Sequence, residues 1–388
     1  MKLCGKNVLN GEVVTLTVAE GRIAGLQPGG DGSAPGGPDV WLAPGFFDIQ
    51  VNGYAGGDFN GGMWIDKAQA AEAFPNIIDK LAVAGTALFC PTVITASKEA
   101  IIERLKAVVA WLDSDARAAR AVPGLHLEGP YIASEDGPRG AHPLEDARDP
   151  DWDEFCRFQE AAAGRLRLCT LAPEREGALA FIEKLVEAGI VAAIGHTGAR
   201  PEVIRDAARA GASLSTHLGN GAHQLLPRHP NYIWEQLAQD ALTASIIADG
   251  HHLPASVVKV IARVKGPERL ILVSDAVALG GLAPGLYAEG RYEVLESGRV
   301  NLAGTPYLAG AGHLLDTCVP NALRSTDLTL AEVVGCVSAI PARLLGLQTR
   351  KGALQTGYDA DLTLFRLPEE GPLEIVATVC GGEITYQA

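Results

Sequence analysis

Eight short apolar segments recur through the middle of the chain, and segments with helical periodicity lie between most of them. The apolar segments are too short for stable helices and are typical of buried strands. They lie near residues 45–51, 86–94, 122–127, 166–171, 190–195, 212–217, 242–248 and 270–274. Strands that alternate with helices in this way predict a parallel sheet, and eight such strands predict an α/β fold of the (β/α)8, TIM-like barrel type.

An open, doubly wound sheet is the alternative fold. Such a sheet usually carries a glycine-rich phosphate loop directly after its first strand. The residues at that place are Pro44-Gly45-Phe46-Phe47-Asp48, which do not form such a loop. We therefore favour the barrel, assign it to residues 44–345, and expect a last helix from Leu330 to Leu345 to close it.

The two ends of the chain have a different pattern. Residues 1–43 and 346–388 contain short strands, such as Val13–Val18 and Ala360–Phe365, which are separated by turns. Neither end holds enough apolar area to be stable alone, because an isolated two-stranded hairpin is marginal in water. We predict that both ends combine into one small β-sandwich domain beside the barrel.

Charge and cysteine usage limit the possible partners. The formal net charge is −14, from 32 basic and 46 acidic residues, which argues against a nucleic-acid partner. No apolar run approaches the roughly 18 residues that would suggest a membrane span. The seven cysteines are widely spaced, contain no Cys-x-x-Cys pair, and are typical of reduced thiols. We expect a cytoplasmic protein that binds a small molecule and neither nucleic acid nor membrane.

Four of the predicted strands end on residues that bind metals or transfer protons. Glu128 follows the third strand, His196 and His217 follow two later strands, and Asp275 follows the last. The carboxyl ends of barrel strands meet at one face, so these side chains are expected to lie close together. A lone histidine is more often an ordinary polar residue, but two at consecutive strand ends favour a metal site.

We predict that Glu128, His196 and His217 bind one divalent metal ion, with zinc as the expected ion. A catalytic zinc site usually has three protein ligands and one open position. Asp275 is the candidate general base, with an ordinary loop aspartate as the alternative. A carboxylate near a metal-bound water can take its proton and later pass it to a leaving amine.

Short motifs extend along almost the whole chain in a fixed order. They are Pro44-Gly45-Phe46-Phe47-Asp48-Ile49-Gln50-Val51-Asn52-Gly53, Gly124-Leu125-His126-Leu127-Glu128-Gly129-Pro130, Gly195-His196-Thr197, Ser215-Thr216-His217-Leu218, Ala248-Asp249-Gly250-His251-His252, Val273-Ser274-Asp275-Ala276 and Asp359-Ala360-Asp361-Leu362. In this order they resemble the amidohydrolase superfamily, and within it the N-acetylglucosamine-6-phosphate deacetylases. The resemblance implies the metal-dependent hydrolase type of barrel and hydrolysis of an N-acetyl group.

The resemblance also implies roles for residues outside the metal set. His142 matches a histidine that helps polarise the acetyl carbonyl. A second group is implied to bind the substrate: Asn220, Gly221, Arg228, His252 and Leu308. His251 is adjacent to His252, and the sequence leaves open which of the two contacts the substrate. In the family the arginine and this histidine can reach a neighbouring subunit's site, which implies a homodimer.

Two kinds of departure from the family pattern refine these expectations. Many amidohydrolases place His-x-His after the first strand for an additional metal, and here those places are Gln50 and Asn52. An amide is a poor zinc ligand beside imidazole, so we expect one metal ion rather than a pair. Residues 219–223 and 224–231 also differ from the family, on the side expected to bind the sugar phosphate.

The expected function is metal-dependent hydrolysis of N-acetylglucosamine-6-phosphate to glucosamine-6-phosphate and acetate. One alternative keeps this chemistry and changes the substrate to another N-acetylhexosamine or an N-acyl amino acid. A further alternative is a catalytically retired amidohydrolase that acts as a scaffold. The intact set of Glu128, His196, His217 and Asp275 argues against the scaffold.

Overall fold

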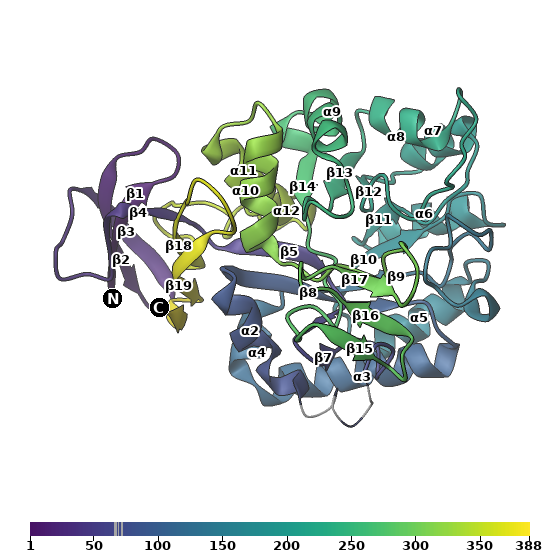
Figure 1. The fold of residues 1–388 in the computed structure, drawn as a ribbon, viewed down its shortest axis with the longest axis horizontal. Helices are drawn as coiled ribbons and strands as arrows, with labels where there is room; N and C mark the ends of the chain where they lie inside the picture. The colour runs from purple at the N-terminus through teal and green to yellow at the C-terminus, as the bar shows by residue number, and fades with distance from the viewer. Residues whose placement is uncertain (66–67, 69, 71–72) are drawn as a thin grey trace.

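A parallel sheet of eight strands forms the centre of the molecule (Figure 1). The computed structural model describes residues 1–65, 68, 70 and 73–388. Neighbouring strands are parallel and follow one another in chain order. The strands are β5 (Phe46–Val51), β8 (Thr86–Ile94), β9 (Leu125–Glu128), β10 (Leu166–Leu171), β11 (Val191–Ile194), β12 (Leu214–Ser215), β13 (Thr243–Ile246) and β14 (Leu270–Leu272).

The sheet closes between its first and last strands. Val51, at the end of β5, forms a parallel bridge with Ala276, which lies beyond the end of β14. The backbone N–H of Asp275 donates to the carbonyl of Gln50 at 3.0 Å across the same seam. Eight parallel strands joined in a ring confirm the predicted (β/α)8 barrel.

Helices surround the barrel and connect most of its strands (Figure 1). Some begin with side-chain caps, for example Ser97, whose hydroxyl accepts the N–H of Ala100 at the start of α3. The helices are α2 (Ile77–Val83), α3 (Lys98–Ser114), α4 (Ala116–Ala121), α5 (Trp152–Ala161), α6 (Ala178–Glu187), α7 (Pro201–Arg209), α8 (Tyr232–Ala238), α9 (Ala255–Lys265), α10 (Leu315–Ser325), α11 (Leu330–Cys336) and α12 (Ala339–Leu344). Short 3-10 helices are η1 (Phe74–Asn76), η2 (Leu144–Asp146) and η3 (Pro267–Arg269).

The last helical segment differs from the expectation. A single helix was expected from Leu330 to Leu345, whereas α11 ends at Cys336 and α12 begins at Ala339. Pro341 explains the break, because in a continuous helix its ring would clash with the carbonyl four residues earlier. As the third residue of a new helix it loses nothing, since the first N–H groups of a helix have no partner within it.

The largest core lies between the barrel and its helices. Leu125 and Leu127 of β9 are fully buried in this core. His126 and Glu128 alternate with them and therefore face the barrel interior. His126 is buried there and its Nε2 lies 2.8 Å from the hydroxyl of Thr170 on β10. Alternation along one short strand thus directs apolar side chains toward the surrounding helices and polar side chains into the barrel interior.

Strands from both ends of the chain form a second sheet at one end of the molecule (Figure 1). β18 pairs antiparallel with β4 and so joins the C-terminal strands to the N-terminal ones. In spatial order the strands are β20 (Glu383–Gln387), β19 (Glu374–Cys380), β18 (Leu362–Arg366), β4 (Gly36–Pro44), β1 (Lys2–Asn7), β2 (Val13–Ala19) and β3 (Arg22–Pro28). The predicted small β-domain built from both termini is confirmed, with its strands joined in one sheet.

Two small antiparallel sheets interrupt the barrel pattern. One follows β5 and consists of β6 (Gly53–Tyr54) and β7 (Gly57–Asp58). The other follows β14 and consists of β15 (Gly285–Tyr287), β16 (Tyr292–Val294) and β17 (Val300–Leu302). Among the described residues, no helix combines the length and the apolar character that crossing a membrane requires.

Candidate active site

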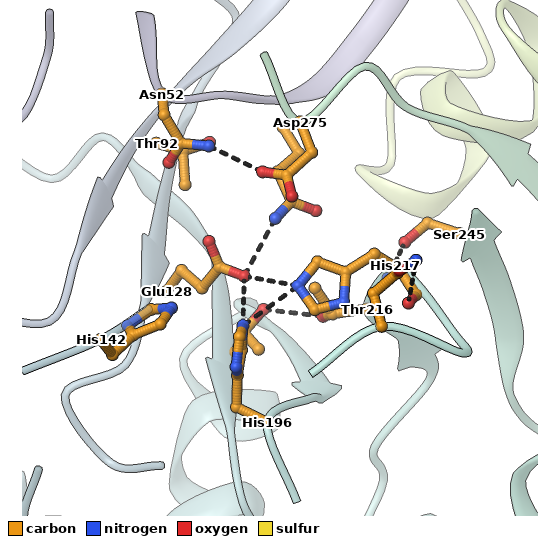
Figure 2. A network of polar contacts seen from close by, with 12 residues as sticks. Asn52, Thr92, Glu128, His142, His196, Thr216, His217, Ser245 and Asp275 are labelled. Carbon is orange, nitrogen blue, oxygen red and sulfur yellow. Dashed lines mark hydrogen bonds and ion pairs between the residues drawn. The ribbon is translucent and has the colours of Figure 1, made fainter. Parts of the chain in front are cut away.

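Side chains from four strand ends converge in one pocket (Figure 2). Glu128 is the last residue of β9, and His196, His217 and Asp275 follow directly after β11, β12 and β14. Parallel strands present all these ends on one face of the barrel, where loops and strand ends build active sites in this fold. The structure therefore brings together all four residues that the sequence placed at strand ends.

The backbone of this site is strained. His196, His217 and Asp275 have φ values of 50°, 29° and 53°, in a region that residues other than glycine rarely adopt. Such conformations cost of order 1–3 kcal/mol each and persist only where the surrounding structure enforces them. The residues that follow β11, β12 and β14 thus share this feature, and all three side chains line the pocket.

The two imidazoles and the carboxylate form a compact triangle of donor atoms. Glu128 Oε1 lies 3.1 Å from His196 Nε2 and 2.9 Å from His217 Nε2. The two Nε2 atoms are 3.1 Å apart. Ligands of a tetrahedral zinc ion, at about 2.0–2.1 Å from the metal, lie roughly 3.3 Å from one another. The triangle has nearly this size, so the three residues can hold one metal ion.

The tautomer of His196 supports the same fit. Its Nδ1 lies 2.9 Å from the carbonyl oxygen of Pro138, which can only accept a hydrogen bond. Nδ1 therefore carries a proton, and in the neutral ring Nε2 presents a lone pair toward Glu128. Two such electron-rich atoms at hydrogen-bond distance repel each other unless a cation lies between them. A backbone carbonyl that fixes the tautomer is the usual companion of a metal-binding histidine.

The pKa values of the triangle show how tightly its members interact. Burial acts to raise the pKa of Glu128, but when no cation is bound its interactions with the two imidazoles outweigh burial and hold that pKa well below its usual value. Burial acts to lower the pKa of His217, but its hydrogen bond and charge interaction with Glu128 raise it overall. The carboxylate is therefore ionised and available as a ligand.

Two amides occupy the places where many amidohydrolases have histidines. Gln50 donates from Nε2 to Glu128 Oε1 at 3.0 Å, and Asn52 donates from Nδ2 to Asp275 Oδ1 at 2.7 Å. Both side chains are buried. Each amide thus restrains one carboxylate of the site and offers an N–H group rather than a lone pair at that point.

Asp275 has the properties expected of a general base. The side chain is half-buried at the bottom of the pocket. Loss of solvent around the carboxyl, followed by the negative charge of Glu128, raises its pKa to about 6. The bond from Asn52 engages Oδ1 and leaves Oδ2 for another partner. A pKa near the operating pH favours proton transfer in both directions.

His142 lies beside the triangle, with its ring centroid 4.3 Å from that of His196. Burial is the main cause that lowers its pKa to about 3, so the ring is neutral at neutral pH. Its Nδ1 lies 2.8 Å from the hydroxyl of Thr95. The one proton of this hydroxyl can go to Nδ1 or to the more distant carbonyl of Glu128 at 3.4 Å. When Thr95 donates to Nδ1, the proton of the ring is on Nε2, where it can be donated to a substrate oxygen.

The residues predicted to bind the substrate fall into two groups. Asn220, Gly221, His252 and Leu308 line the same pocket of about 180 Å³ as the triangle. Arg228 does not line it, and its side chain is exposed in the loop that leads to α8. Within one chain, the structure therefore brings together four of these five residues.

Gly221 has a clear steric reason for its identity. Its φ is 55°, and a Cβ at this position would lie 2.8 Å from His196 Nδ1. Any larger residue would push against the ring of a candidate metal ligand. Gly221 therefore allows the loop after His217 to pack directly on His196.

The adjacent residues His251 and His252 have different surroundings. His252 lines the pocket. The His251 ring instead stacks on His313, with centroids 5.3 Å apart and an interplanar angle of 21°. Of the two adjacent histidines, His252 is therefore the one that lines the pocket.

Residues 41–385 match the model of the amidohydrolase family, and this range covers most of the chain. The chain belongs to the amidohydrolase family. An N-acetylglucosamine-6-phosphate deacetylase of Bacillus subtilis is 31% identical over 351 residues, covering 90% of this chain and 85% of the relative. An N-acetylgalactosamine-6-phosphate deacetylase of Escherichia coli O157:H7 is 32% identical over 352 residues, covering 89% of each chain.

A solved structure from Mycobacterium smegmatis is similar over 99% of both chains, with a TM-score of 0.85 and 29% identity. It is a variant of an N-acetyl-D-glucosamine-6-phosphate deacetylase in complex with N-acetyl-D-glucosamine-6-phosphate.

Several pocket residues of this amidohydrolase were not found from the sequence. Trp64 lines the pocket and donates from Nε1 to the carbonyl of Ala309, another lining residue. Thr95 and Asp249 hold the two pocket histidines His142 and His252. Trp64 lies in an irregular segment with no periodicity. Asp249 lies in a recognised motif, but only its contact with His252 assigns it a role.

Proposed function

We propose that this amidohydrolase hydrolyses the N-acetyl group of N-acetylglucosamine-6-phosphate and releases acetate and glucosamine-6-phosphate. The observation that carries the proposal is the metal-sized triangle of Glu128, His196 and His217 in one pocket with Asp275. The similarity to deacetylases of N-acetylhexosamine 6-phosphates over most of the chain supports the substrate class.

The cofactor proposed is one zinc ion held by Glu128, His196 and His217. When bound, such an ion acidifies a water molecule and polarises a carbonyl group. Gln50 and Asn52 support a single ion, because their amides bond to Glu128 and Asp275 in the places where histidines would bind another metal.

The chain's own residues account for the proton transfers. Asp275 accepts a proton from the attacking water as the water oxygen forms a bond to the acetyl carbon. His142 donates a hydrogen bond from Nε2 to the carbonyl oxygen, where negative charge develops. Asp275 then returns the proton to the nitrogen as the C–N bond breaks. Asn52 keeps Asp275 in one orientation for both steps.

An acetate-release assay tests the proposal, with metal content measured on the same sample. N-acetylglucosamine-6-phosphate is expected to give the highest kcat/KM among N-acetylhexosamines, their 6-phosphates and N-acyl amino acids. Highest activity on an N-acyl amino acid would contradict the substrate. A purified protein with neither bound metal nor activity on any member would instead indicate a scaffold.

N-acetylgalactosamine-6-phosphate is the second candidate substrate. The relative from Escherichia coli O157:H7 favours it as much as the Bacillus subtilis relative favours the glucosamine compound, since their identities are 32% and 31%. The two sugars differ only in the configuration at one hydroxyl-bearing carbon. The ratio of kcat/KM on the two 6-phosphates distinguishes these candidates directly.

We also propose that the protein is a homodimer in which Arg228 reaches the pocket of the partner subunit. Arg228 is exposed and does not line its own pocket. Leu225 and Trp234, nearby in the same loop and in α8, are 91% and 55% exposed. An exposed arginine between exposed apolar residues suits an interface. Light scattering at assay concentration tests the dimer, and a monomer that is fully active would contradict it.

The cysteines support the cytoplasmic location that we propose. All seven are free thiols, and all but Cys156 are buried or partly buried within the fold. Disulfides are rare in the reducing cytosol, where such thiols persist. Fractionation of the native host is the measurement that tests the location.

A further inference from the structure

The ring of His223 lies where three loops from the carboxyl ends of barrel strands meet. His223 belongs to the loop after β12, and its Nε2 is 3.1 Å from Glu135 Oε2 in the loop after β9. A Cβ atom on Gly198, in the loop after β11, would lie only 3.0 Å from Cε1 of the same ring. The loops after β9 and β11 also carry the pocket residues His142 and His196. One side chain therefore joins the loops that carry these two histidines.

Tyr232 anchors His223 to the core. Tyr232 is the first residue of α8 and is buried in the largest core. Its hydroxyl oxygen accepts the backbone N–H of His223 at 2.8 Å and lies 3.0 Å from Nδ1 of the same residue. In a neutral ring with its proton on Nε2, the tyrosine donates to Nδ1 and Nε2–H donates to Glu135. A ring with protons on both nitrogens keeps both contacts, so the anchor does not depend on the charge of His223.

The segment around Pro138 packs against both His223 and His196. A Cβ atom on Gly137 would lie 3.0 Å from Cα of His223, and a Cβ atom on Gly221 would lie 3.3 Å from the carbonyl oxygen of Pro138. The backbones of the two loops are therefore in direct contact. The Pro138 carbonyl accepts the hydrogen bond from His196 Nδ1 at 2.9 Å. The segment that His223 contacts thus supplies the partner of a candidate metal ligand.

The same segment leads to His142. The backbone N–H of Arg139 donates to the carbonyl of Glu135 at 3.0 Å, and its guanidinium donates to the carbonyl of His142 at 2.7 Å. Pro138 lies between the two residues that these bonds connect. A displacement of Glu135 would therefore move the Pro138 carbonyl and the backbone of His142 together.

Gly198 forms a fixed surface for the other side of the ring. Its backbone N–H donates to Glu174 Oε1 at 2.7 Å, and the hydroxyl of Thr197 donates to Oε2 of the same carboxylate at 2.6 Å. Glu174 thus uses both oxygens to hold the two residues directly after His196. Because this surface is held in place, the position of the His223 ring determines how closely the 135–142 segment packs.

We propose that His223 is a positioning residue of the metal centre. Anchored on Tyr232, it holds residues 135–142 against His196, so that the Pro138 carbonyl keeps its bond to Nδ1 and Nε2 stays directed at the metal position. The inference rests on the proposed function and adds to it a residue from a segment that departs from the family pattern. A partner that fixes the tautomer and orientation of a metal-binding histidine strengthens metal binding.

Four variants test this role. His223→Ala removes the ring from the junction of the loops. His223→Gln is the conservative change, because its amide can place an N–H near the position of Nε2 and keep the contact with Glu135. Glu135→Ala removes that contact alone, between side chains that are 29% and 69% exposed. Gln224→Ala is the matched control, since Gln224 is adjacent in the same loop and exposed.

Metal affinity is one measurement. For His223→Ala, the zinc dissociation constant from competition with a chromogenic chelator is expected to rise about 10-fold, the lower end of the effect of residues that support metal ligands, because His223 acts through Pro138. Glu135→Ala should raise it about two- to fivefold, since exposed ion pairs contribute little. His223→Gln should lie between His223→Ala and the wild type, and Gln224→Ala should match the wild type.

The proton on His196 Nδ1 gives a second measurement, which reports on the Pro138 bond itself. In the cobalt(II)-substituted protein, the Nδ1–H protons of metal-bound histidines give NMR signals shifted far outside the normal range. One of the signals from His196 and His217 is expected to exchange with solvent about tenfold faster in His223→Ala, because the loop that protects it opens more often. The same signal should be unchanged in Gln224→Ala.

A double variant tests whether Tyr232 and His223 act as one unit. Tyr232→Phe removes the hydroxyl that anchors His223 and should weaken zinc binding by a similar factor. Combined with His223→Ala it should cost less than the product of the two single effects, because both changes disrupt the same junction. Fully independent effects would overturn the inference.

A folded His223→Ala protein with unchanged zinc affinity and unchanged proton exchange would also overturn it. A loss of zinc affinity that proton exchange does not follow would assign the effect to general stability and have the same consequence. If His223→Ala does not fold, Glu135→Ala decides by the same two measurements, because its side chain is exposed and outside the core.

This inference and the proposed function fail in different ways. A wild type that binds no metal ion and releases no acetate would overturn the proposed function. A wild type that does both, beside a His223→Ala variant with the same zinc affinity and proton exchange, would overturn the role of His223 alone.

Discussion

The two sides of the pocket are built in different ways. On the metal side, Glu128, His196, His217 and Asp275 are at the ends of barrel strands and lie within 3.1 Å of a polar partner. The first three are buried and Asp275 is half-buried. On the sugar-phosphate side, Asn220 and Leu308 lie on loops and are half-buried, and Arg228 is exposed. Strand ends fix atoms precisely enough for chemistry, whereas loops can vary and select the substrate.

The largest effect is expected from removal of the metal. Dialysis against a chelator should abolish acetate release, because the ion supplies several kcal/mol of charge stabilisation, worth at least about 10³-fold in rate. Activity should return with zinc, and the measurement is turnover against bound metal. Full activity of a demonstrably metal-free protein would contradict the metal-binding role of Glu128, His196 and His217. The distinction between a metal side and a sugar-phosphate side of the pocket would then no longer hold.

Asp275→Asn should have the next largest effect. A general acid–base group contributes about 10²- to 10⁴-fold, so kcat should fall by that factor while the metal content stays constant. Asn52→Leu removes only the bond that orients Asp275 and should cost less. Near-normal turnover of a zinc-loaded Asp275→Asn protein would show that the base is elsewhere.

The pH dependence should follow Asp275. Burial and the charge of Glu128 raise its pKa to about 6 without a metal, and a bound cation opposes that rise. The base must be ionised, so kcat/KM should be constant above that pKa and fall about tenfold per pH unit below it. This acidic limb should be missing from the residual activity of Asp275→Asn. An unchanged limb in that variant would assign it to another group.

Arg228→Ala should have the smallest effect and should act on the substrate side alone. KM for the phosphorylated substrate is expected to rise about 10- to 100-fold with little change in kcat, because a charged hydrogen bond to phosphate is lost. Unphosphorylated N-acetyl sugars should be hydrolysed as before. An equal loss on both substrates would place Arg228 in the general structure of the site.

Mixed dimers sharpen this last prediction. When Arg228→Ala and Asp275→Asn subunits are unfolded and refolded together, a hybrid dimer contains one intact site only if Arg228 acts across the interface. The mixture should then regain low-KM activity that neither variant has alone. Absence of any regain in a proven hybrid would place Arg228 in its own subunit's pocket.

The strand pattern was a reliable guide because burial on both faces leaves little freedom of composition. The segments expected near 86–94 and 166–171 are β8 and β10 with the same ends. The helix over 330–345 was wrong, because Pro341 fits an apolar periodic pattern while preventing a continuous helix. The sequence also has a helical pattern from Lys67 to Ala84, which predicts a helix between the first two strands. The structure describes this segment in part: α2 covers Ile77–Val83, and residues 67, 69, 71 and 72 lie outside the described residues.

The sequence by itself determined the barrel and the kind of side chain at each strand end, because strand periodicity and the carboxyl-end rule depend only on local pattern. It also separated Gln50 and Asn52 from the ligands by their chemistry. Only the tertiary structure decided that these amides bond to Glu128 and Asp275, that His252 rather than His251 faces the pocket, and that Asp249 holds it. Such contacts join segments far apart in the chain or depend on how a loop turns, and no local pattern specifies them.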